Sequence, residues 1–220
     1  MTRALEAELR AGLDALSLAL DDAQVTALLD YMALIQKWTK VYNLTAVREP
    51  RDMLTHHVLD SLAVVRPLRQ QLAALCLGQA VRVLDVGSGA GLPGVVLAIC
   101  FPEMTVHCVD TVAKKAAFVQ QVAVSLKLGN LRGIHARVES LTEPYDVVCS
   151  RAFASLADFT QWSRAALAPG GMWMAMKGKH PKAELAALTA LVPDVAVFHV
   201  EPLQVPGLDA ERCLVWMRRT

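Results

Sequence analysis

Hydrophobic residues recur every three or four positions through residues 1–80, which is the spacing of amphipathic helices. The pattern predicts one helix over residues 3–20 and a second over residues 23–41. Asp21 and Asp22 stand between them and offer the second helix an N-cap and a favourable charge. Pro50 predicts the start of a third helix, which runs through MLTHHVLDSLAVV. No strand pattern is evident in this segment, so we expect it to be helical.

From residue 81 the pattern changes to short β-branched runs that alternate with helical segments. Strands are predicted over residues 81–86, 105–110, 145–150, 171–177 and 212–219, and one further strand is predicted to end near Ile134. Helices are predicted at residues 94–101, 111–129 and 155–168. This alternation is typical of a parallel, doubly wound sheet. We therefore predict an α/β fold with a helical extension over residues 1–80 and a Rossmann-like domain over residues 81–220.

Composition narrows the classes of function. Of the 220 residues, 54% are hydrophobic, which is enough for a sizeable core. No apolar run reaches the roughly 18 residues of a membrane span, and the amphipathic N-terminus does not resemble a signal peptide. We therefore expect a cytoplasmic protein with no membrane partner. The five cysteines are scattered and form no CxxC pair, so no metal site is expected.

The stretch LDVGSGAGLPG, from Leu84 to Gly94, follows the first predicted strand. Its glycines at positions 87, 89 and 91 permit positive φ angles and a close approach of the backbone to a ligand. We expect the next helix to begin near Leu92, with Pro93 in its first turn. Free N–H groups at that helix start would favour an anionic group.

The residues of this loop leave two cofactor classes open. A phosphate-binding P-loop is excluded because the loop has no lysine. Gly89 to Gly94 satisfies GxGxxG, so an NAD(P)-dependent oxidoreductase stays a less favoured alternative. Asp110 ends the next strand and is placed to bind ribose hydroxyls of a dinucleotide or of an adenosyl cofactor. The DxGxGxG form that begins at Asp85 resembles the loop of class I S-adenosylmethionine-dependent methyltransferases. No separate substrate domain is evident after residue 81, which disfavours a hydride-transferring enzyme.

Five segments occur in an order that makes the resemblance more specific. They are NLTAVREPRDMLTHHVLDSL (43–62), DVGSGAGLPG (85–94), SRAFASL (150–156), KG (177–178) and LDAERCLVWM (208–217). Together they resemble the RsmG family, also called GidB, for glucose-inhibited division protein B. The resemblance covers nearly the whole chain and is least distinctive in the first forty residues.

This resemblance implies a fold, a reaction and a set of contacts. The fold is a class I methyltransferase sheet with an N-terminal helical extension. The reaction transfers a methyl group from S-adenosylmethionine to N7 of a guanine in the 530 loop of bacterial 16S ribosomal RNA, and leaves S-adenosylhomocysteine. By position, the family's cofactor contacts fall on Gly87, Leu92, Val138, Glu139 and Arg151. A non-catalytic factor that binds S-adenosylmethionine and assists ribosome assembly is the second hypothesis.

The implied chemistry needs no strong base, because guanine N7 has a free lone pair. Proximity and orientation then supply most of the catalysis. Arg151 ends the fourth strand and is our candidate catalytic residue; it either contacts the base or the cofactor, or holds the loop by an ion pair. Phe153 either stacks on an extruded base or packs in the core. Cys149 lies inside an apolar strand, which disfavours a nucleophilic role.

The net charge is +1, so binding of 16S rRNA or of the small ribosomal subunit must depend on local basic residues. We predict RNA contacts at Lys177, Lys179 and Arg212, although KGKHPK (177–182) also fits a solvated helix start. Arg212 contacts either RNA or the neighbouring Glu211. His57 either binds phosphate or caps its helix against Asp60, and we favour the cap. A monomer is the expected state, and the sequence leaves open whether naked RNA, an assembly intermediate or the 30S subunit is the substrate.

Overall fold

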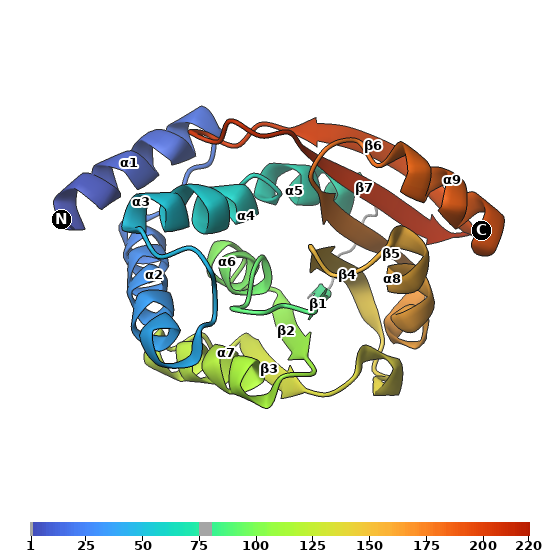
Figure 1. The fold of residues 1–220 in the computed structure, drawn as a ribbon, viewed down its shortest axis with the longest axis horizontal. Coiled ribbons are helices and arrows are strands. Elements are labelled where there is room, and N and C mark those ends of the chain that lie inside the picture. Colours follow the sequence, from blue (N-terminus) through green and yellow to red (C-terminus); the bar gives the residue numbers. More distant parts are fainter. Residues whose placement is uncertain (1, 75–80) are drawn as a thin grey trace.

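A computed structural model describes residues 2–74 and 81–220 of the chain. Its centre is a seven-stranded sheet in the order β3-β2-β1-β4-β5-β7-β6 (Figure 1). The strands are β1 (Arg82–Val86), β2 (Thr105–Asp110), β3 (Leu131–His135), β4 (Tyr145–Arg151), β5 (Leu167–Lys177), β6 (Val195–Leu203) and β7 (Arg212–Arg219). The expected domain boundary after residue 80 adjoins residues 75–80, which lie outside the described residues, as does Cys76.

The topology puts a crevice at the centre of the sheet. Strands β1 to β5 pair in parallel, and β7 pairs antiparallel with both β5 and β6. The chain passes from β1 outward to β2 and β3, and then returns to β4 on the other side of β1. At such a reversal the connecting loops diverge, which leaves room for a ligand beyond the carboxyl ends of the strands. The α/β fold expected from the sequence is thus confirmed.

Helices precede the sheet, as the hydrophobic spacing predicted. They are α1 (Thr2–Ala15), α2 (Asp22–Tyr42), α3 (Pro50–Met53), the π-helix η1 (Leu54–Leu59), α4 (Asp60–Leu62) and α5 (Val65–Ala74). Asp21 caps α2 through a capping box with Gln24. The first helix ends five residues earlier than expected, and Ser17 follows it with a left-handed φ of 54°. The third helix is interrupted by η1, a wider turn often found at functional sites.

Two hydrophobic cores cover the two faces of the sheet because strand side chains alternate between faces. The helices that follow β1 are α6 (Gly94–Cys100), α7 (Ala113–Ser125), the 3-10 helix η2 (Val138–Ser140), α8 (Leu156–Trp162), the 3-10 helix η3 (Arg164–Ala166) and α9 (Lys182–Leu191). One core joins α6 and α7 to the N-terminal helices, and the other lies under α8 and α9.

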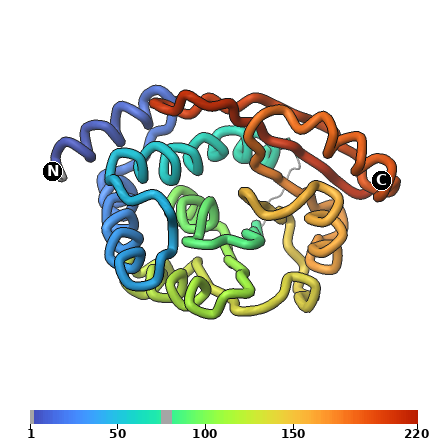
Figure 2. The backbone as a smooth tube through the Cα atoms, viewed as in Figure 1, coloured from blue at the N-terminus to red at the C-terminus, as the bar shows by residue number. Residues whose placement is uncertain are grey.

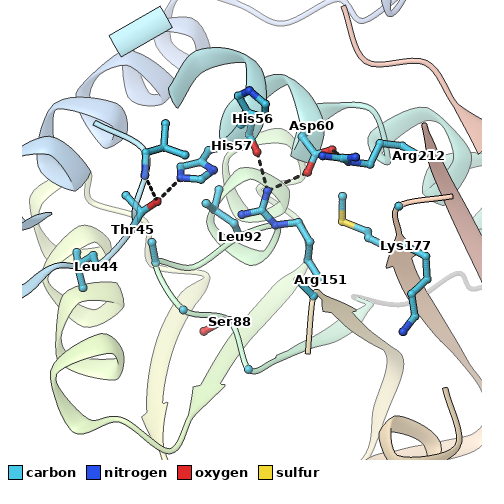
Figure 3. A pocket seen from close by; sticks show the side chains of 17 residues that line it. Leu44, Thr45, His56, His57, Asp60, Ser88, Leu92, Arg151, Lys177 and Arg212 are labelled. Carbon is cyan, nitrogen blue, oxygen red and sulfur yellow. Dashed lines mark hydrogen bonds and ion pairs between the residues drawn. The ribbon is translucent and has the colours of Figure 1, made fainter. Parts of the chain in front are cut away.

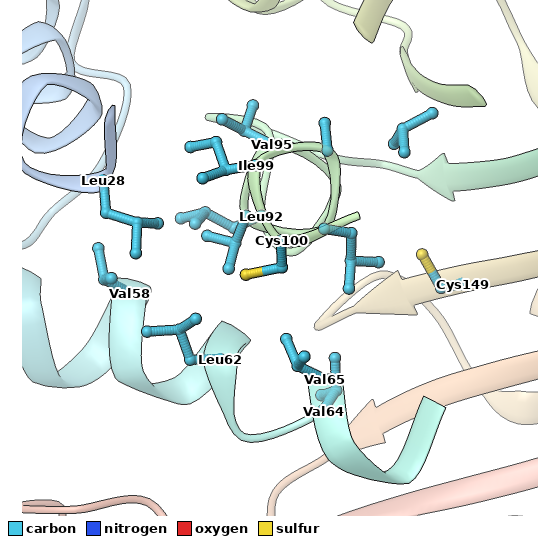
Figure 4. Packing of buried hydrophobic residues seen from close by; sticks show 14 of the residues in the cluster. Leu28, Val58, Leu62, Val64, Val65, Leu92, Val95, Ile99, Cys100 and Cys149 are labelled. Carbon is cyan, nitrogen blue, oxygen red and sulfur yellow. The ribbon is translucent and has the colours of Figure 1, made fainter. Parts of the chain in front are cut away.

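The N-terminal helices pack against helix α6. All of its residues are buried, and Leu28 of α2, Val58 of η1 and Leu62 of α4 belong to the same core (Figure 4). In Figure 2 the N-terminal backbone, blue to cyan, curves around this helix. Burial of each such leucine or valine contributes roughly 1.5–3 kcal/mol. The extension is therefore packed onto the sheet domain through α6, which holds η1 beside the ends of the central strands.

In the sheet domain, too, several elements differ from the sequence predictions: helix α7 ends at Ser125 and not at residue 129, and helix α9 was not among the predicted helices. The helix expected over residues 155–168 ends at Trp162 as α8, and a 3-10 turn leads into β5, which starts earlier than expected. Strand β6 was not predicted, because half-buried and exposed residues are mixed along it without regular alternation. It is an edge strand that pairs only with β7 in the sheet order. Among the described residues, no helix is long and apolar enough to cross a membrane.

Candidate functional site

The loop between β1 and α6 lies at the carboxyl ends of the central strands. Its left-handed residues are Gly87 (φ 65°), Gly89 (φ 59°) and Gly91 (φ 87°). The amides of Gly87 and Ser88 donate to the carbonyl of Val109 in β2. The amide of Gly89 donates to Asp110 Oδ2 at 3.0 Å. These bonds hold the loop against β2, and the glycines make this tight path possible because they tolerate positive φ.

Asp85 lies fully buried beneath this loop at the end of β1. Its Oδ2 accepts from the amide of Gly94 at 2.8 Å, and its Oδ1 has no partner among the described residues. Burial raises the pKa of this carboxyl to about 7, although the Gly94 amide lowers it. Helix α6 begins at Gly94, as predicted from the 94–101 pattern, and Pro93 is its N-cap and not part of its first turn. We expected the first N–H groups of this helix to be free to bind an anionic ligand. The amide of Gly94 is not free, because it donates to Asp85.

Two cavities meet at the loop. The larger, of about 570 Å³, extends toward η1 and the start of β7 (Figure 3). The smaller, of about 400 Å³, extends toward the end of β2 and η2. Gly87 and Ala152 line both cavities. Ala152 follows β4 and has a left-handed φ of 51°, which is uncommon for a residue with a side chain. An elongated ligand that crosses the loop would occupy both cavities.

Two arginines share one carboxylate at the wall of the larger cavity. Arg151, at the end of β4, donates from Nη1 to Asp60 Oδ2 at 2.8 Å and to the carbonyl of His56 at 2.9 Å. Arg212, at the start of β7, donates from Nε to Asp60 Oδ1 at 2.9 Å. Arg212 also donates to the backbone carbonyl of Glu211, not to its carboxylate. The ion pair left open for Arg151 is thus present, and its partner is Asp60 (Figure 3).

His57 does not contact Asp60 in the way the sequence suggested. Its Nε2 lies 2.7 Å from Thr45 Oγ1, and its buried Nδ1 has no hydrogen-bond partner among the described residues. Burial lowers the pKa of this imidazole, which favours the neutral ring. The cap prediction is wrong, because the ring nitrogen that makes a contact faces Thr45 and the carboxylate of Asp60 is bonded to two arginines. Both oxygens of Asp60 accept from arginines.

The smaller cavity brings together four of the predicted cofactor residues. Asp110 Oδ1 accepts from the amide of Val112 at 2.8 Å, and Lys115 Nζ lies 3.8 Å from Asp110 Oδ2. Val138 is buried in η2 and Glu139 is exposed beside it. The predicted residues that line this cavity are Gly87, Asp110, Val138 and Glu139. Those that line the larger cavity are Gly87, Gly89, Leu92 and Arg151.

Phe153 forms part of the wall between the loop and α8. Its ring packs edge-on against Phe159 and Trp162, at centroid distances of 6.4 and 5.8 Å. A Cβ added at Gly87 would lie 2.2 Å from Phe153 Cδ2, whereas one added at Gly89 would meet nothing within 4 Å. The space over Gly89 is therefore open toward the larger cavity, as a cofactor that lies against the loop requires. Phe153 supports the cavity by packing, one of the two roles left open for it.

The predicted RNA contacts differ in exposure. Lys179 is exposed, but Lys177 and Arg212 are half-buried. Lys177 Nζ donates to the carbonyl of Ala154 and pairs with Glu184 of α9, each at 2.7 Å. Glu184 also accepts from the amide of Leu156 at 2.9 Å. Lys177 and Glu184 thus hold the loop that follows β4. Sequence analysis missed Glu184, although a glutamate in the first turn of the helix after KGKHPK is a visible signal for pairing with a lysine.

The described residues support neither a nucleophilic role for Cys149 nor a metal site. Cys149 is fully buried in β4, and burial raises the pKa of its thiol well above the ordinary value. This agrees with the structural role expected for it. Within residues 2–74 and 81–220, no three His, Cys, Asp or Glu side chains are grouped as metal ligands. Thr45 was another omission of the sequence analysis; it lies in the NLT element, whose loop lines the larger cavity.

Comparison with known proteins decides the family. A family model described as GidB, rRNA small subunit methyltransferase G, matches residues 24–215. The chain belongs to the GidB family. It is 67% identical over 224 residues to the ribosomal RNA small subunit methyltransferase G of Albidiferax ferrireducens, with 99% of each chain covered. It is 68% identical over 213 residues to that of a Polaromonas species, with 97% of this chain and 93% of the other covered.

Solved structures show that this GidB-family chain has the class I S-adenosylmethionine-dependent methyltransferase fold. A methyltransferase from Thiobacillus denitrificans, crystallised with S-adenosylhomocysteine, matches with a TM-score of 0.51 at 14% identity. The match covers 71% of this chain and 92% of the other. The family resemblance stated from the five segments is confirmed. The region matched by the GidB model includes both cavities described above.

Proposed function

We propose that this protein transfers a methyl group from S-adenosylmethionine to N7 of a guanine in the 530 loop of 16S ribosomal RNA. Membership in the GidB family supports S-adenosylmethionine as the donor and the RNA of the small ribosomal subunit as the substrate. The observation that carries the proposal is the pair of cavities joined at the glycine loop, with Asp110 in one and Arg151 in the other. The choice of N7 and of the 530 loop rests on the family resemblance.

In this proposal the cofactor crosses the loop. Asp110 accepts hydrogen bonds from the ribose hydroxyls, and η2, with Val138 and Glu139, borders the adenine in the smaller cavity. Gly89 and Leu92 border the amino-acid portion in the larger cavity, where the open space over Gly89 admits it. The bound cofactor supplies an electrophilic methyl group on a sulfonium. The glycine loop then acts as a rigid floor, because its amides are already bonded to β2.

Methyl transfer to N7 requires the protein to orient the reactants and does not require it to remove a proton. The guanine lone pair is free at neutral pH, so no side chain has to remove a proton. His57 is bonded to Thr45 and its lowered pKa favours the neutral form, so it adds no charge to the cavity. We assign Arg151 to orienting the reacting groups, since arginine recognises the O6/N7 edge of guanine. Proximity supplies most of the rate enhancement, which for oriented reactants reaches about 7–11 kcal/mol.

For the RNA we propose contacts at Lys179, Arg212 and Lys177 around the mouth of the larger cavity. Lys179 is exposed and free to reach a phosphate, whereas Lys177 contributes charge from its place beside Glu184. With a net charge of only +1, electrostatic attraction is local, and the shape of the substrate must supply part of the recognition. We propose that a monomer acts, and that it acts in the cytoplasm.

Methylation of ribosomal substrates tests the proposal directly. Purified protein is incubated with methyl-tritiated S-adenosylmethionine and either unmodified 30S subunits or naked 16S RNA. Borohydride reduction and aniline cleavage then locate N7-methylguanine. We expect one cleavage, in the 530 loop, and no label with an Arg151→Ala variant. Cofactor binding without label in either RNA would refute the proposed reaction and favour the non-catalytic assembly factor.

A further inference from the structure

Asp60 stands out among the residues around the larger cavity because it is the only acid among the described residues that line it. Its carboxylate is 2% exposed and lies between two guanidinium groups. The side chains of Arg151 and Arg212 are 21% and 24% exposed, so both cations are partly withdrawn from water. One carboxylate thus offsets two fixed positive charges, since arginine stays protonated in proteins.

This arrangement matters for a cavity that receives a cation. The proposed donor carries a sulfonium, and its demethylated product carries a neutral thioether; the rest of the two molecules is the same. With Asp60 present, the three charged groups sum to +1. Without it, two guanidinium groups would face the ligand, and a neighbouring sulfonium would be repelled while a thioether would not. Partial burial strengthens such effects because the surrounding medium has a lower dielectric constant than water.

We propose that Asp60 is a specificity-determining residue for the methyl donor. Its charge lowers the electrostatic cost of holding a cationic centre between the glycine loop and the two arginines, and so favours the sulfonium donor over the thioether product. The inference rests on the proposed function and extends it, because it assigns a difference between substrate and product binding to one side chain. The same charge would also favour the positive charge that develops on guanine as N7 is alkylated.

A purely structural role for Asp60 makes a different prediction. The side chain joins the helical segment 50–62 to the ends of β4 and β7, so its loss would also loosen the cavity wall. A loosened wall would weaken both ligands by the same factor. A change of charge acts equally on the amino-acid portion that both ligands share, and it acts in addition on the sulfonium that only the donor carries. The ratio of the two dissociation constants therefore separates the two roles.

The experiment measures binding of S-adenosylmethionine and S-adenosylhomocysteine to the full chain by titration calorimetry. Sinefungin, whose amine is a second cationic probe, is measured beside them. The variants are Asp60→Asn, Arg212→Gln and a control, Glu143→Gln. Glu143 also pairs with an arginine, Arg82, but lines neither cavity. Thermal unfolding of each variant shows whether it is folded.

Opposite shifts are expected from the two charge changes. Asp60→Asn should weaken both cationic ligands about tenfold more than S-adenosylhomocysteine. Arg212→Gln removes a positive charge and should shift the ratio of the dissociation constants about threefold in favour of the cationic ligands. Glu143→Gln should leave the ratio unchanged. This pattern would support the proposal, and a simple loss of structure would not produce it.

Three results would count against it. Equal weakening of all ligands by Asp60→Asn, or a shift in the same direction for Asp60→Asn and Arg212→Gln, would overturn the role of Asp60. If Asp60→Asn does not fold, an unchanged or lowered preference for cations in Arg212→Gln would still overturn it. Failure of the wild-type protein to bind either natural ligand would instead overturn the proposed function, so the two failures are distinguishable.

Discussion

Replacement of Asp85 by asparagine should change how the stability of this protein depends on pH. Asp85 is buried under the glycine loop, where Oδ2 accepts from the amide of Gly94 and Oδ1 has no partner among the described residues. An asparagine oxygen still accepts from that amide. The substitution therefore keeps the one hydrogen bond and removes an ionisable group from a fully buried position.

The size of the effect follows from the pKa of Asp85. Burial raises it from the ordinary 3.8 to about 7, so the folded protein binds the proton more tightly than the unfolded chain. The stabilisation is complete below pH 3.8, and it is lost progressively as the pH rises through the folded pKa. At about 1.36 kcal/mol per pKa unit the whole loss is about 4 kcal/mol, of which about 3 kcal/mol falls between pH 5 and pH 8.

Urea unfolding of the ligand-free protein at pH 5 and pH 8 measures this loss. The lowered pKa values of His57 and His107 act in the opposite direction, since their stabilisation is lost as the pH falls. They are present in both proteins, so the difference between wild type and Asp85→Asn isolates Asp85. From pH 5 to pH 8 we expect the free energy of unfolding of the variant to rise by about 3 kcal/mol relative to that of the wild type. A difference that stays constant with pH would refute the reasoning.

Three further substitutions test the site. Gly89→Ala should weaken S-adenosylhomocysteine at least about tenfold in calorimetry, because its methyl group enters the open cavity at positive φ; an unchanged affinity would contradict this. Cys149→Ala should retain methyl transfer in the tritium assay, and inactivity of a folded variant would restore the nucleophile hypothesis. Lys177→Met loses its bonds to Ala154 and Glu184, so we expect the free energy of unfolding to fall by about 1 kcal/mol, seen as a lower melting temperature, and the KM for the cofactor to rise; an unaltered KM would show that the loop needs no such support.

The sequence by itself determined the elements that contain the site. Strand–helix alternation, the glycines after the first strand and the acid at the end of the second predicted a crevice that the glycine loop and Asp110 line. These signals are local: a turn needs glycine where φ is positive, and parallel strands bring their carboxyl ends to one edge. Five segments along the chain also identified the family. The cofactor contacts carried over by position lie in two cavities that meet at Gly87 and Ala152.

Only the tertiary structure decided which charges meet in that crevice. Asp60 accepts from Arg151, which is 91 residues away, and from Arg212, which is 152 residues away. Residue spacing within one helix predicted instead that Asp60 would contact His57, three positions before it in the sequence. His57 instead contacts Thr45, and packing of the N-terminal helices on α6 places Asp60 beside the end of β4 and the start of β7. Periodicity describes neighbours along a segment, whereas these pairings depend on how separate segments pack, because a buried carboxylate is stable only where its partners reach it.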